Sequence, residues 1–330
     1  MITPYIKSIG YYVPEKTVSN DDLAKVIDTS DEWIFSHTGI KNRHFAAENE
    51  NNSDLATKAA EIAMKKAGIT ADDVDMIFTC TTTPDYLSFP ATACIVQENL
   101  GAKTAGAFDL SAACSGFIYG VETASTYIKS GAYKNIIVIG CEILSRIIDM
   151  SDRNTAVLFG DGAGAVVISP CEDNKAGSAI ISSHLRSEGS GAEYLKRHAG
   201  GTKYPFIPGK SSPQELFLYM NGRQVYNFAI RAVTDTVLAL MENNNLKIDD
   251  IKYIFPHQAN IRIIEGVAKR SAIPIEKFYL NIEKFANTSA ASIPIAIGEA
   301  DENNLLHRGD NIITVGFGGG LTYGGNYIKW

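Results

Sequence analysis

Apolar residues follow two spacings along the chain, and stretches with the two spacings alternate. Consecutive apolar residues at 74–81, 107–110 and 135–141 are typical of strands buried on both faces of a sheet. Shorter patterns predict further strands at 5–9 and, after a glycine-rich turn, at 159–168. Apolar residues at helical spacing predict amphipathic helices at 53–68, 90–100 and 117–128, and again at 225–241 and 262–270. Serines followed by acidic residues, at Ser19 and Ser30, are typical of helix starts.

The second half of the sequence repeats short stretches of the first half in the same order. Residues 250–255 parallel 73–78, residues 287–292 parallel 111–116, and residues 309–316 parallel 133–140. We therefore expect an α/β fold of two similar units, residues 1–172 and 173–330, stacked as five α-β-α-β-α layers with shared central helices. The glycine-rich tract 187–212 predicts a long loop with little structure of its own.

Composition and charge narrow the class of protein. Of the 330 residues, 45% are hydrophobic and 20% are charged, which is typical of a globular protein. The formal net charge of −7 gives no general reason to expect nucleic-acid binding, and no apolar run is long enough to span a membrane. The five cysteines form no CxxC pair or zinc-ligand cluster, and no secretory signal is present. We expect a cytoplasmic protein with reduced thiols and no metal.

The stretch from Phe108 to Phe117 holds the first candidate for chemistry. A strand pattern ends there in small residues, Cys114 follows, and a helical pattern begins at Phe117. Free N–H groups and the positive end of the helix dipole favour a thiolate, so a lowered pKa is expected for the Cys114 thiol. Small neighbouring residues leave room for a substrate carbonyl group. A buried structural cysteine is the alternative interpretation.

Three features of the second half lie at junctions that correspond to the one at Cys114. His257 follows the strand at 250–255, where α/β proteins build sites, and Asn287 opens an apolar helix. The glycines of 316–320 bring backbone N–H groups close to a ligand, as an oxyanion hole requires. The alternatives are a hydrogen-bonded structural histidine, a helix-capping asparagine and a phosphate-binding glycine loop.

These motifs, taken in order, resemble the β-ketoacyl-acyl-carrier-protein synthase III family, whose members are condensing enzymes of the thiolase superfamily. The resemblance spans nearly the whole chain and implies the five-layer thiolase fold and a homodimer. The matching stretches are 29–34 with 38–40, 112–117, 152–153, 159–165, 256–260, 287–292 and 316–320.

The resemblance also implies a reaction that begins fatty acid synthesis. Cys114 takes an acyl group from acyl-CoA, malonyl-acyl-carrier protein then enters, and His257 and Asn287 hydrogen-bond the thioester oxygen during decarboxylation. The N–H groups of Cys114 and Gly319 form the oxyanion hole, and no cofactor is used beyond the CoA and phosphopantetheine thioesters. The resemblance further implies that Trp33 and Arg153 lie around the CoA adenine and that Arg262 contacts CoA phosphate or the carrier protein's phosphopantetheine. It places Phe89 and Phe317 at the acyl pocket, with Phe89 reaching across the dimer.

Three positions depart from the family pattern. His37 stands where arginine is usual, Asn227 where lysine is common, and Ala286 where glycine is usual. The first two differences remove positive charge from the substrate entrance. Residues 196–198 could restore some of this charge, but we interpret them as a solvated loop. Two alternatives stay open: a specialised condensing enzyme or acyltransferase of a dedicated or secondary-metabolite pathway, and a non-enzymatic binding or scaffold protein. A chalcone-synthase-like enzyme usually has proline at 319, and a hydroxymethylglutaryl-CoA synthase needs a glutamate near Phe89.

Overall fold

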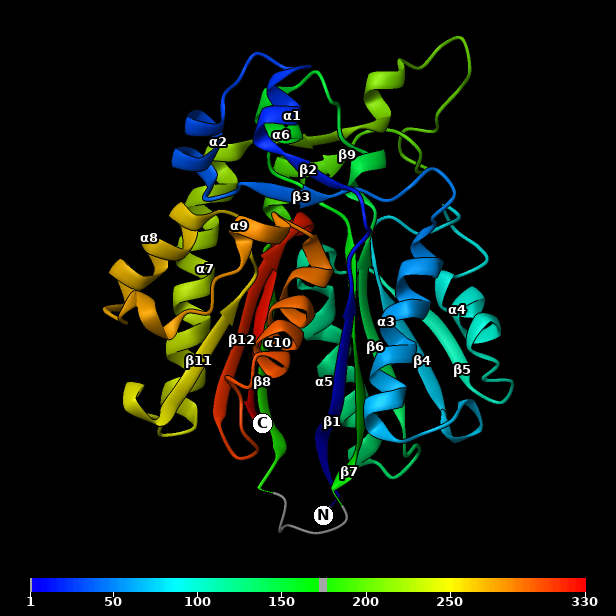
Figure 1. Cartoon of the computed structure of the whole chain (residues 1–330), viewed down its shortest axis with the longest axis vertical. Helices are drawn as coiled ribbons and strands as arrows, with labels where there is room; N and C mark the ends of the chain where they lie inside the picture. Colours follow the sequence, from blue (N-terminus) through cyan, green and yellow to red (C-terminus); the bar gives the residue numbers. More distant parts are fainter. Residues whose placement is uncertain (1, 172–176) are drawn as a thin grey trace.

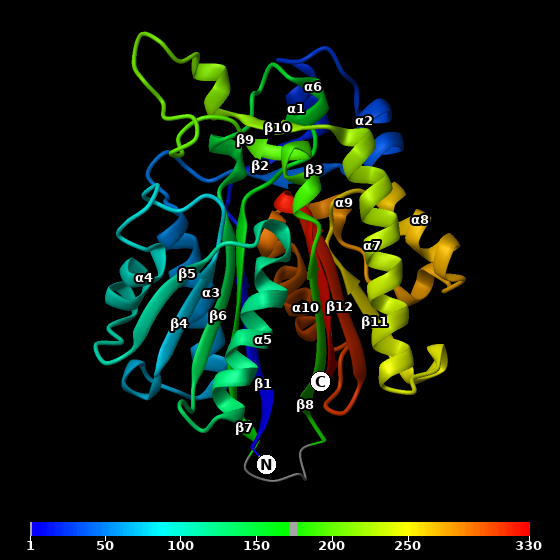
Figure 2. The ribbon, with the colours of Figure 1, turned by 180° about the vertical axis from the view of Figure 1, so that it is seen from behind.

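The protein is built on two mixed β-sheets that stand side by side (Figures 1 and 2). The computed structural model describes residues 2–171 and 177–330. The first sheet has the order β1 (Thr3–Tyr12), β7 (Gly162–Cys171), β6 (Ile136–Glu142), β4 (Met76–Cys80) and β5 (Gly106–Leu110). The second has the order β11 (Ile251–Pro256), β12 (Asn311–Gly318), β13 (Thr322–Lys329) and β8 (Ala179–Ser187).

The pairing of the strands repeats from one sheet to the other. In the first sheet β4 and β6 are parallel, and β7 continues antiparallel to β6. In the second sheet β11 and β12 are parallel, and β13 continues antiparallel to β12. By the sequence parallels, β11 is the counterpart of β4 and β12 is the counterpart of β6, so the topology agrees with the predicted repeat. The predicted boundary between residues 172 and 173 lies outside the described residues.

Helices form the other three layers (Figures 1 and 2). The central layer is α5 (Gly116–Lys129) and α10 (Ser292–Glu302), which contact strands of both sheets. The outer helices are α3 (Asn52–Ala67) and α4 (Thr92–Leu100) on the first sheet and α7 (Gly222–Asn243) with α8 (Ile261–Ser271) on the second. The central core includes Phe117, Phe255 and Ile293, which are buried between the sheets. The five-layer arrangement predicted from the sequence is confirmed.

Short elements gather at one end of the sheets (Figure 1). They are α1 (Asn20–Ala24), α2 (Asp31–Thr38), α6 (Arg153–Ala156), α9 (Ile282–Phe285), and two small sheets, β2 (Thr17–Ser19) with β3 (Asn42–His44) and β9 (Leu195–Arg197) with β10 (Leu218–Met220). The predicted caps are present, since Ser19 accepts a hydrogen bond from the Asp22 N–H and Ser30 from the Trp33 N–H. Among the described residues, no helix is long and apolar enough to cross a membrane.

The prediction of a nearly structureless loop over 187–212 was wrong in its first part. Residues Gly189–Tyr194 form a 3-10 turn, and β9 pairs with β10. The interpretation of 196–198 as a solvated loop was also wrong: Arg197 is half-buried and donates through Nε to the Leu216 carbonyl at 2.7 Å, and Lys196 pairs with Glu193. Local composition gave no sign of this pairing, because the partner strand lies about twenty residues further along the chain.

Candidate active site

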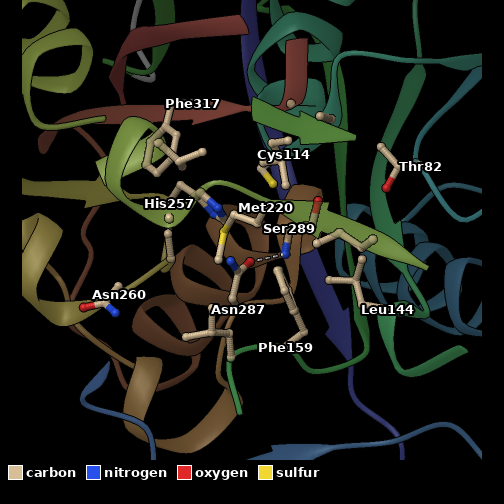
Figure 3. Close-up of a pocket in the computed structure, with 18 of the residues that line it drawn as sticks. Thr82, Cys114, Leu144, Phe159, Met220, His257, Asn260, Asn287, Ser289 and Phe317 are labelled. Atoms are coloured by element: carbon tan, nitrogen blue, oxygen red, sulfur yellow. Dashed lines mark hydrogen bonds between the residues drawn. The ribbon is translucent and has the colours of Figure 1, made fainter. Parts of the chain in front are cut away.

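A mostly apolar pocket of about 250 Å³ lies at the end of the sheets that carries the short elements. Cys114, His257 and Asn287 all line it, as do Phe317 and Gly319 (Figure 3). Its walls are largely aliphatic and aromatic, and they come from segments far apart in the sequence: Leu144, Leu158, Phe159, Leu195, Leu218, Met220 and Phe317. The structure thus brings together the three residues that sequence analysis assigned to chemistry.

Cys114 lies in a 3-10 turn, Ala113–Ser115, that leads directly into α5. The predicted helix therefore begins one residue before Phe117, and the sulfur lies at its N-terminal end. The expected lowering of the Cys114 pKa was wrong. Burial raises the pKa of the thiol to about 12, and the hydrogen bond with Ser289 and the N–H of Cys114 itself only partly oppose this. The resting group is a neutral thiol.

His257 follows β11 and is held as a neutral imidazole. Its backbone N–H donates to the Val315 carbonyl at 2.8 Å, and burial lowers the pKa of the ring to about 3. Ser292 Oγ lies 2.7 Å from Nδ1 and also accepts, at 3.4 Å, from the Gln258 N–H. When the Ser292 hydroxyl donates its proton to Nδ1, the ring is an acceptor at that nitrogen. The remaining ring proton is then on Nε2, where it can be donated to a ligand.

Asn287 is fixed by its backbone and by its own side chain. Its N–H donates to Leu158 and its carbonyl accepts from Gly160. Its Oδ1 accepts from the Ser289 N–H at 2.9 Å, which directs the amide nitrogen away from that bond (Figure 3). Asn287 does not open the helix as expected, since α10 begins at Ser292. The oxygen instead closes a turn two residues on, a common use of asparagine.

The residue before Asn287 has an unusual backbone conformation. Ala286 has φ 58° and ψ −157°, a region that is populated almost only by glycine. This is the position at which sequence analysis noted alanine in place of glycine. The conformation is held by its surroundings, because Ala286 is buried and its N–H donates to the Ile282 carbonyl at 2.9 Å.

The glycines after β12 approach Cys114 closely. Gly318 ends the strand, and a Cβ atom built on it would lie 2.5 Å from the Cys114 nitrogen. Only glycine allows this approach. Gly319 follows and lines the pocket, so its backbone reaches the same space as that of Cys114. An oxyanion hole formed by the N–H groups of Cys114 and Gly319 stays a prediction that this proximity allows.

The comparisons with known proteins agree with this geometry. The family model described as 3-oxoacyl-[acyl-carrier-protein (ACP)] synthase III matches residues 108–189, and that for its C-terminal part matches residues 241–330. The β-ketoacyl-[acyl-carrier-protein] synthase III of Fusobacterium nucleatum is 51% identical, and that of Clostridioides difficile is 48% identical, each over 98% of both chains. The chain belongs to the 3-oxoacyl-[acyl-carrier-protein] synthase III family.

Solved structures of this family confirm the thiolase-like fold. The crystal structure of the synthase III from Aquifex aeolicus VF5 has a TM-score of 0.90 and 42% identity, and the match covers 99% of this chain and 100% of that chain. The priming β-ketosynthase of the R1128 polyketide pathway has a TM-score of 0.91 but only 30% identity, over 99% and 96% of the two chains. The fold is shared by both, and the sequence is closer to the synthases III.

The residues that the family resemblance assigns to CoA lie outside the pocket lining. The Arg153 guanidinium lies 4.6 Å from the centre of the Trp33 ring, and the His37 ring stacks on the same indole at 4.5 Å. Arg262 is exposed and donates through Nη2 to the Ser36 carbonyl at 3.0 Å. These side chains form a polar and aromatic patch next to the pocket residue Asn260, which donates to the His37 carbonyl.

Sequence analysis of this synthase missed three polar residues of the site. Ser289 lines the pocket, Ser292 contacts His257, and Glu142 lies fully buried at the end of β6. Both serines belong to the stretch 287–292 that had been compared with the one around Cys114, but their partners are distant in sequence. A signal for Glu142 exists, since it is a lone acidic residue at the end of an otherwise apolar strand.

Proposed function

We propose that this protein is a β-ketoacyl-acyl-carrier-protein synthase that joins an acyl group from acyl-CoA to malonyl-acyl-carrier protein and so starts fatty acid synthesis. One observation carries the proposal: a thiol, an imidazole and a side-chain amide line a single apolar pocket. This set provides a nucleophile and two neutral hydrogen-bond donors, which a decarboxylating condensation requires.

In the first half-reaction, Cys114 Sγ attacks the thioester carbon of acyl-CoA. The carbonyl oxygen becomes an oxyanion that accepts hydrogen bonds from the N–H groups of Cys114 and Gly319. The carbon–sulfur bond to CoA then breaks, and the thiol proton ends on the departing CoA sulfur. Because burial raises the pKa of Cys114 to about 12, loss of the proton accompanies the attack and does not precede it.

In the second half-reaction, malonyl-acyl-carrier protein replaces CoA. The bond between the malonyl carboxylate and the adjacent carbon breaks, CO₂ leaves, and the electron pair forms an enolate. The enolate oxygen accepts hydrogen bonds from His257 Nε2 and Asn287 Nδ2. The nucleophilic carbon then attacks the acyl carbon on Cys114, the bond to sulfur breaks, and the sulfur takes a proton from water. The low pKa of His257 keeps the imidazole a neutral donor throughout.

The entrance patch supports binding of CoA and phosphopantetheine. Trp33 and Arg153 are already stacked on each other at 4.6 Å, so an adenine stacks on the indole only once the Arg153 side chain moves aside, with Arg262 nearby for phosphate. His37 and Asn227 are less basic than the residues usual at these positions, and Asn227 is exposed on α7 beside the pocket residue Tyr226. This difference favours, as a second candidate, the same reaction within a dedicated pathway that uses its own carrier protein.

Exposed apolar side chains support a homodimer. Phe89 is 84% exposed, and the nearby Leu87 and Tyr86 are also exposed. Such a group on one short segment is typical of a surface that a partner covers. We propose that a second copy covers it and that Phe89 thereby closes the acyl pocket of the neighbouring subunit. The proposed location is the cytoplasm, supported by the free thiols of Cys80, Cys94, Cys114 and Cys141.

The two half-reactions can be tested separately. Intact-mass spectrometry after incubation with a panel of acyl-CoA primers should show one acyl group on the wild type and on Cys94→Ala, a matched control at an exposed cysteine. Cys114→Ala should not be acylated. His257→Ala and Asn287→Ala should be acylated but should release CO₂ from malonyl-acyl-carrier protein at least about 100-fold more slowly. Condensation by Cys114→Ala, or an unacylated wild type, would refute the proposal.

A further inference from the structure

Glu142 is a buried carboxylate directly behind the pocket. It ends β6 and has no exposed surface, and no salt bridge to it is found within residues 2–171 and 177–330. Its partners are hydroxyl and N–H groups. Oε1 accepts from Thr82 N and Oγ1, each at 3.1 Å, and from Ser289 Oγ at 3.0 Å. Oε2 accepts from Thr83 Oγ1 at 2.5 Å and from Thr81 Oγ1 at 3.2 Å.

The surrounding hydrogen bonds require Oε2 of Glu142 to be an acceptor, and the Thr82 N–H donates to Oε1. Thr83 Oγ1 already accepts from the Ile143 N–H and from Asn52 Nδ2. Thr81 Oγ1 already accepts from the Thr83 N–H and from the same Asn52 amide. With its lone pairs used, each hydroxyl has only its proton left, and that proton faces Oε2. Burial raises the pKa of Glu142, while these donors oppose the rise by stabilising the charged form.

Ser289 connects this carboxylate to the site. Its hydroxyl donates to Glu142 Oε1, while its backbone N–H donates to Asn287 Oδ1 (Figure 3). Ser289 has φ 50°, a left-handed conformation that serine rarely adopts. The bond to Glu142 spans 147 positions in sequence and ties the loop of the second half to a strand of the first. The two hydrogen bonds of Ser289 therefore connect Glu142 to the side-chain amide of Asn287, and loss of the bond to Glu142 leaves only the one to Asn287.

From this geometry we infer that Glu142 is a positioning residue for decarboxylation: through Ser289 it fixes the orientation in which Asn287 presents its amide nitrogen to the thioester oxygen. The inference rests on the proposed function, since it uses the assigned role of Asn287. Glu142 does not touch the substrate. Its link to Asn287 passes through one residue, Ser289, whose hydroxyl also forms a hydrogen bond with Cys114.

A double-mutant cycle tests this route. Glu142→Gln keeps the size of the side chain but places an NH₂ group against the Thr82 N–H or against the Thr81 and Thr83 hydroxyl protons. Ser289→Ala cuts the link and leaves the carboxylate with its threonines. Each single variant should lower the rate of malonyl-thioester decarboxylation about 10- to 100-fold, less than the loss expected when a donor is removed. The double variant should be no slower than Glu142→Gln alone, because the two changes break the same link.

Two further measurements separate positioning from a general loss of structure. Acylation of Cys114 by acyl-CoA, which does not use Asn287, should not fall in Glu142→Gln, because the carboxylate charge that raises the pKa of Cys114 is removed. KM for the malonyl thioester should change little while kcat for decarboxylation falls. Glu299→Gln is the matched control: Glu299 is also buried, but it pairs with Lys284 and lies outside the pocket lining. This variant should leave the ratio of decarboxylation to acylation unchanged.

The outcomes are distinct. Additive losses in the cycle, or equal losses of acylation and decarboxylation in Glu142→Gln, would overturn the inference and leave the proposed function intact. A wild-type protein that does not decarboxylate malonyl thioesters would overturn both. A crystal structure of Glu142→Gln adds a readout independent of activity. It should show the contact between Ser289 N and Asn287 Oδ1 lengthened beyond hydrogen-bond distance, and an unchanged contact would contradict the inference.

Discussion

One methyl group added at Gly318 should disable Cys114 without altering the cysteine itself. Gly318 has extended backbone angles, φ −158° and ψ −174°, so alanine is conformationally acceptable there. The obstacle is steric: the new Cβ would lie 2.5 Å from the Cys114 nitrogen, 3.0 Å from Ala113 Cβ and 3.2 Å from the Ser115 nitrogen. Ordinary contact begins at 3.4 Å, so the backbone of Cys114 must retreat by up to about 0.9 Å.

A displacement of this size at a reacting group costs about 100-fold in rate, or about 2.7 kcal/mol of barrier. We therefore expect Gly318→Ala to lower the rate of Cys114 acylation about 100-fold, measured by rapid quench and intact-mass spectrometry. Overpacking should also reduce the free energy of unfolding by about 1–3 kcal/mol, measured by urea denaturation. Gly189→Ala is the control, because its Cβ would meet nothing within 4 Å. Acylation at the wild-type rate in a stable Gly318→Ala protein would refute this reasoning.

Two other predictions concern protons. Burial raises the pKa of Cys114 to about 12, so its thiolate fraction should rise about tenfold per pH unit from pH 7 to 9. The rate of alkylation by iodoacetamide, measured at the Cys114 peptide by mass spectrometry, should rise in the same proportion. A plateau of this rate near pH 7 would instead show a lowered pKa. Ser292→Ala removes the hydrogen bond that holds the His257 ring at Nδ1, so CO₂ release should fall about tenfold while acylation of Cys114 is unchanged. An equal loss of both rates would contradict the role assigned to His257 in decarboxylation.

Sequence patterns predicted the fold well because the strands carry their own signal. The stretches around Phe78 and Val138 are apolar throughout, as strands covered on both faces must be, and they became β4 and β6. The repeated order of motifs predicted that the junctions at Cys114, His257 and Asn287 correspond. In a duplicated fold, corresponding junctions lie at the same end of the two sheets, and all three side chains line one pocket.

The properties of the site residues could not be predicted in the same way, because they depend on contacts between distant segments. The local sequence of Cys114 indicates a helix start, which lowers a thiol pKa, but the pocket that surrounds it reverses the shift. Leu195 belongs to that pocket and comes from the tract 187–212, which was predicted to have little structure. Glu142 and Ser289 are likewise joined only in the folded chain. Local spacing identifies reactive groups, and long-range packing sets their protonation and orientation.

Part of the pocket wall is carried by different elements from those that carry the reacting residues, and this affects how such enzymes can diversify. Leu195, Leu218 and Met220 are carried by the small sheet of β9 and β10, which is paired with neither of the large sheets. Substitutions in this small sheet change the volume available to an acyl chain without altering the layers that hold Cys114 and His257. Each methylene accommodated or refused is worth about 1–3 kcal/mol of selectivity. Chain-length preference can therefore drift in evolution while the reaction itself stays fixed.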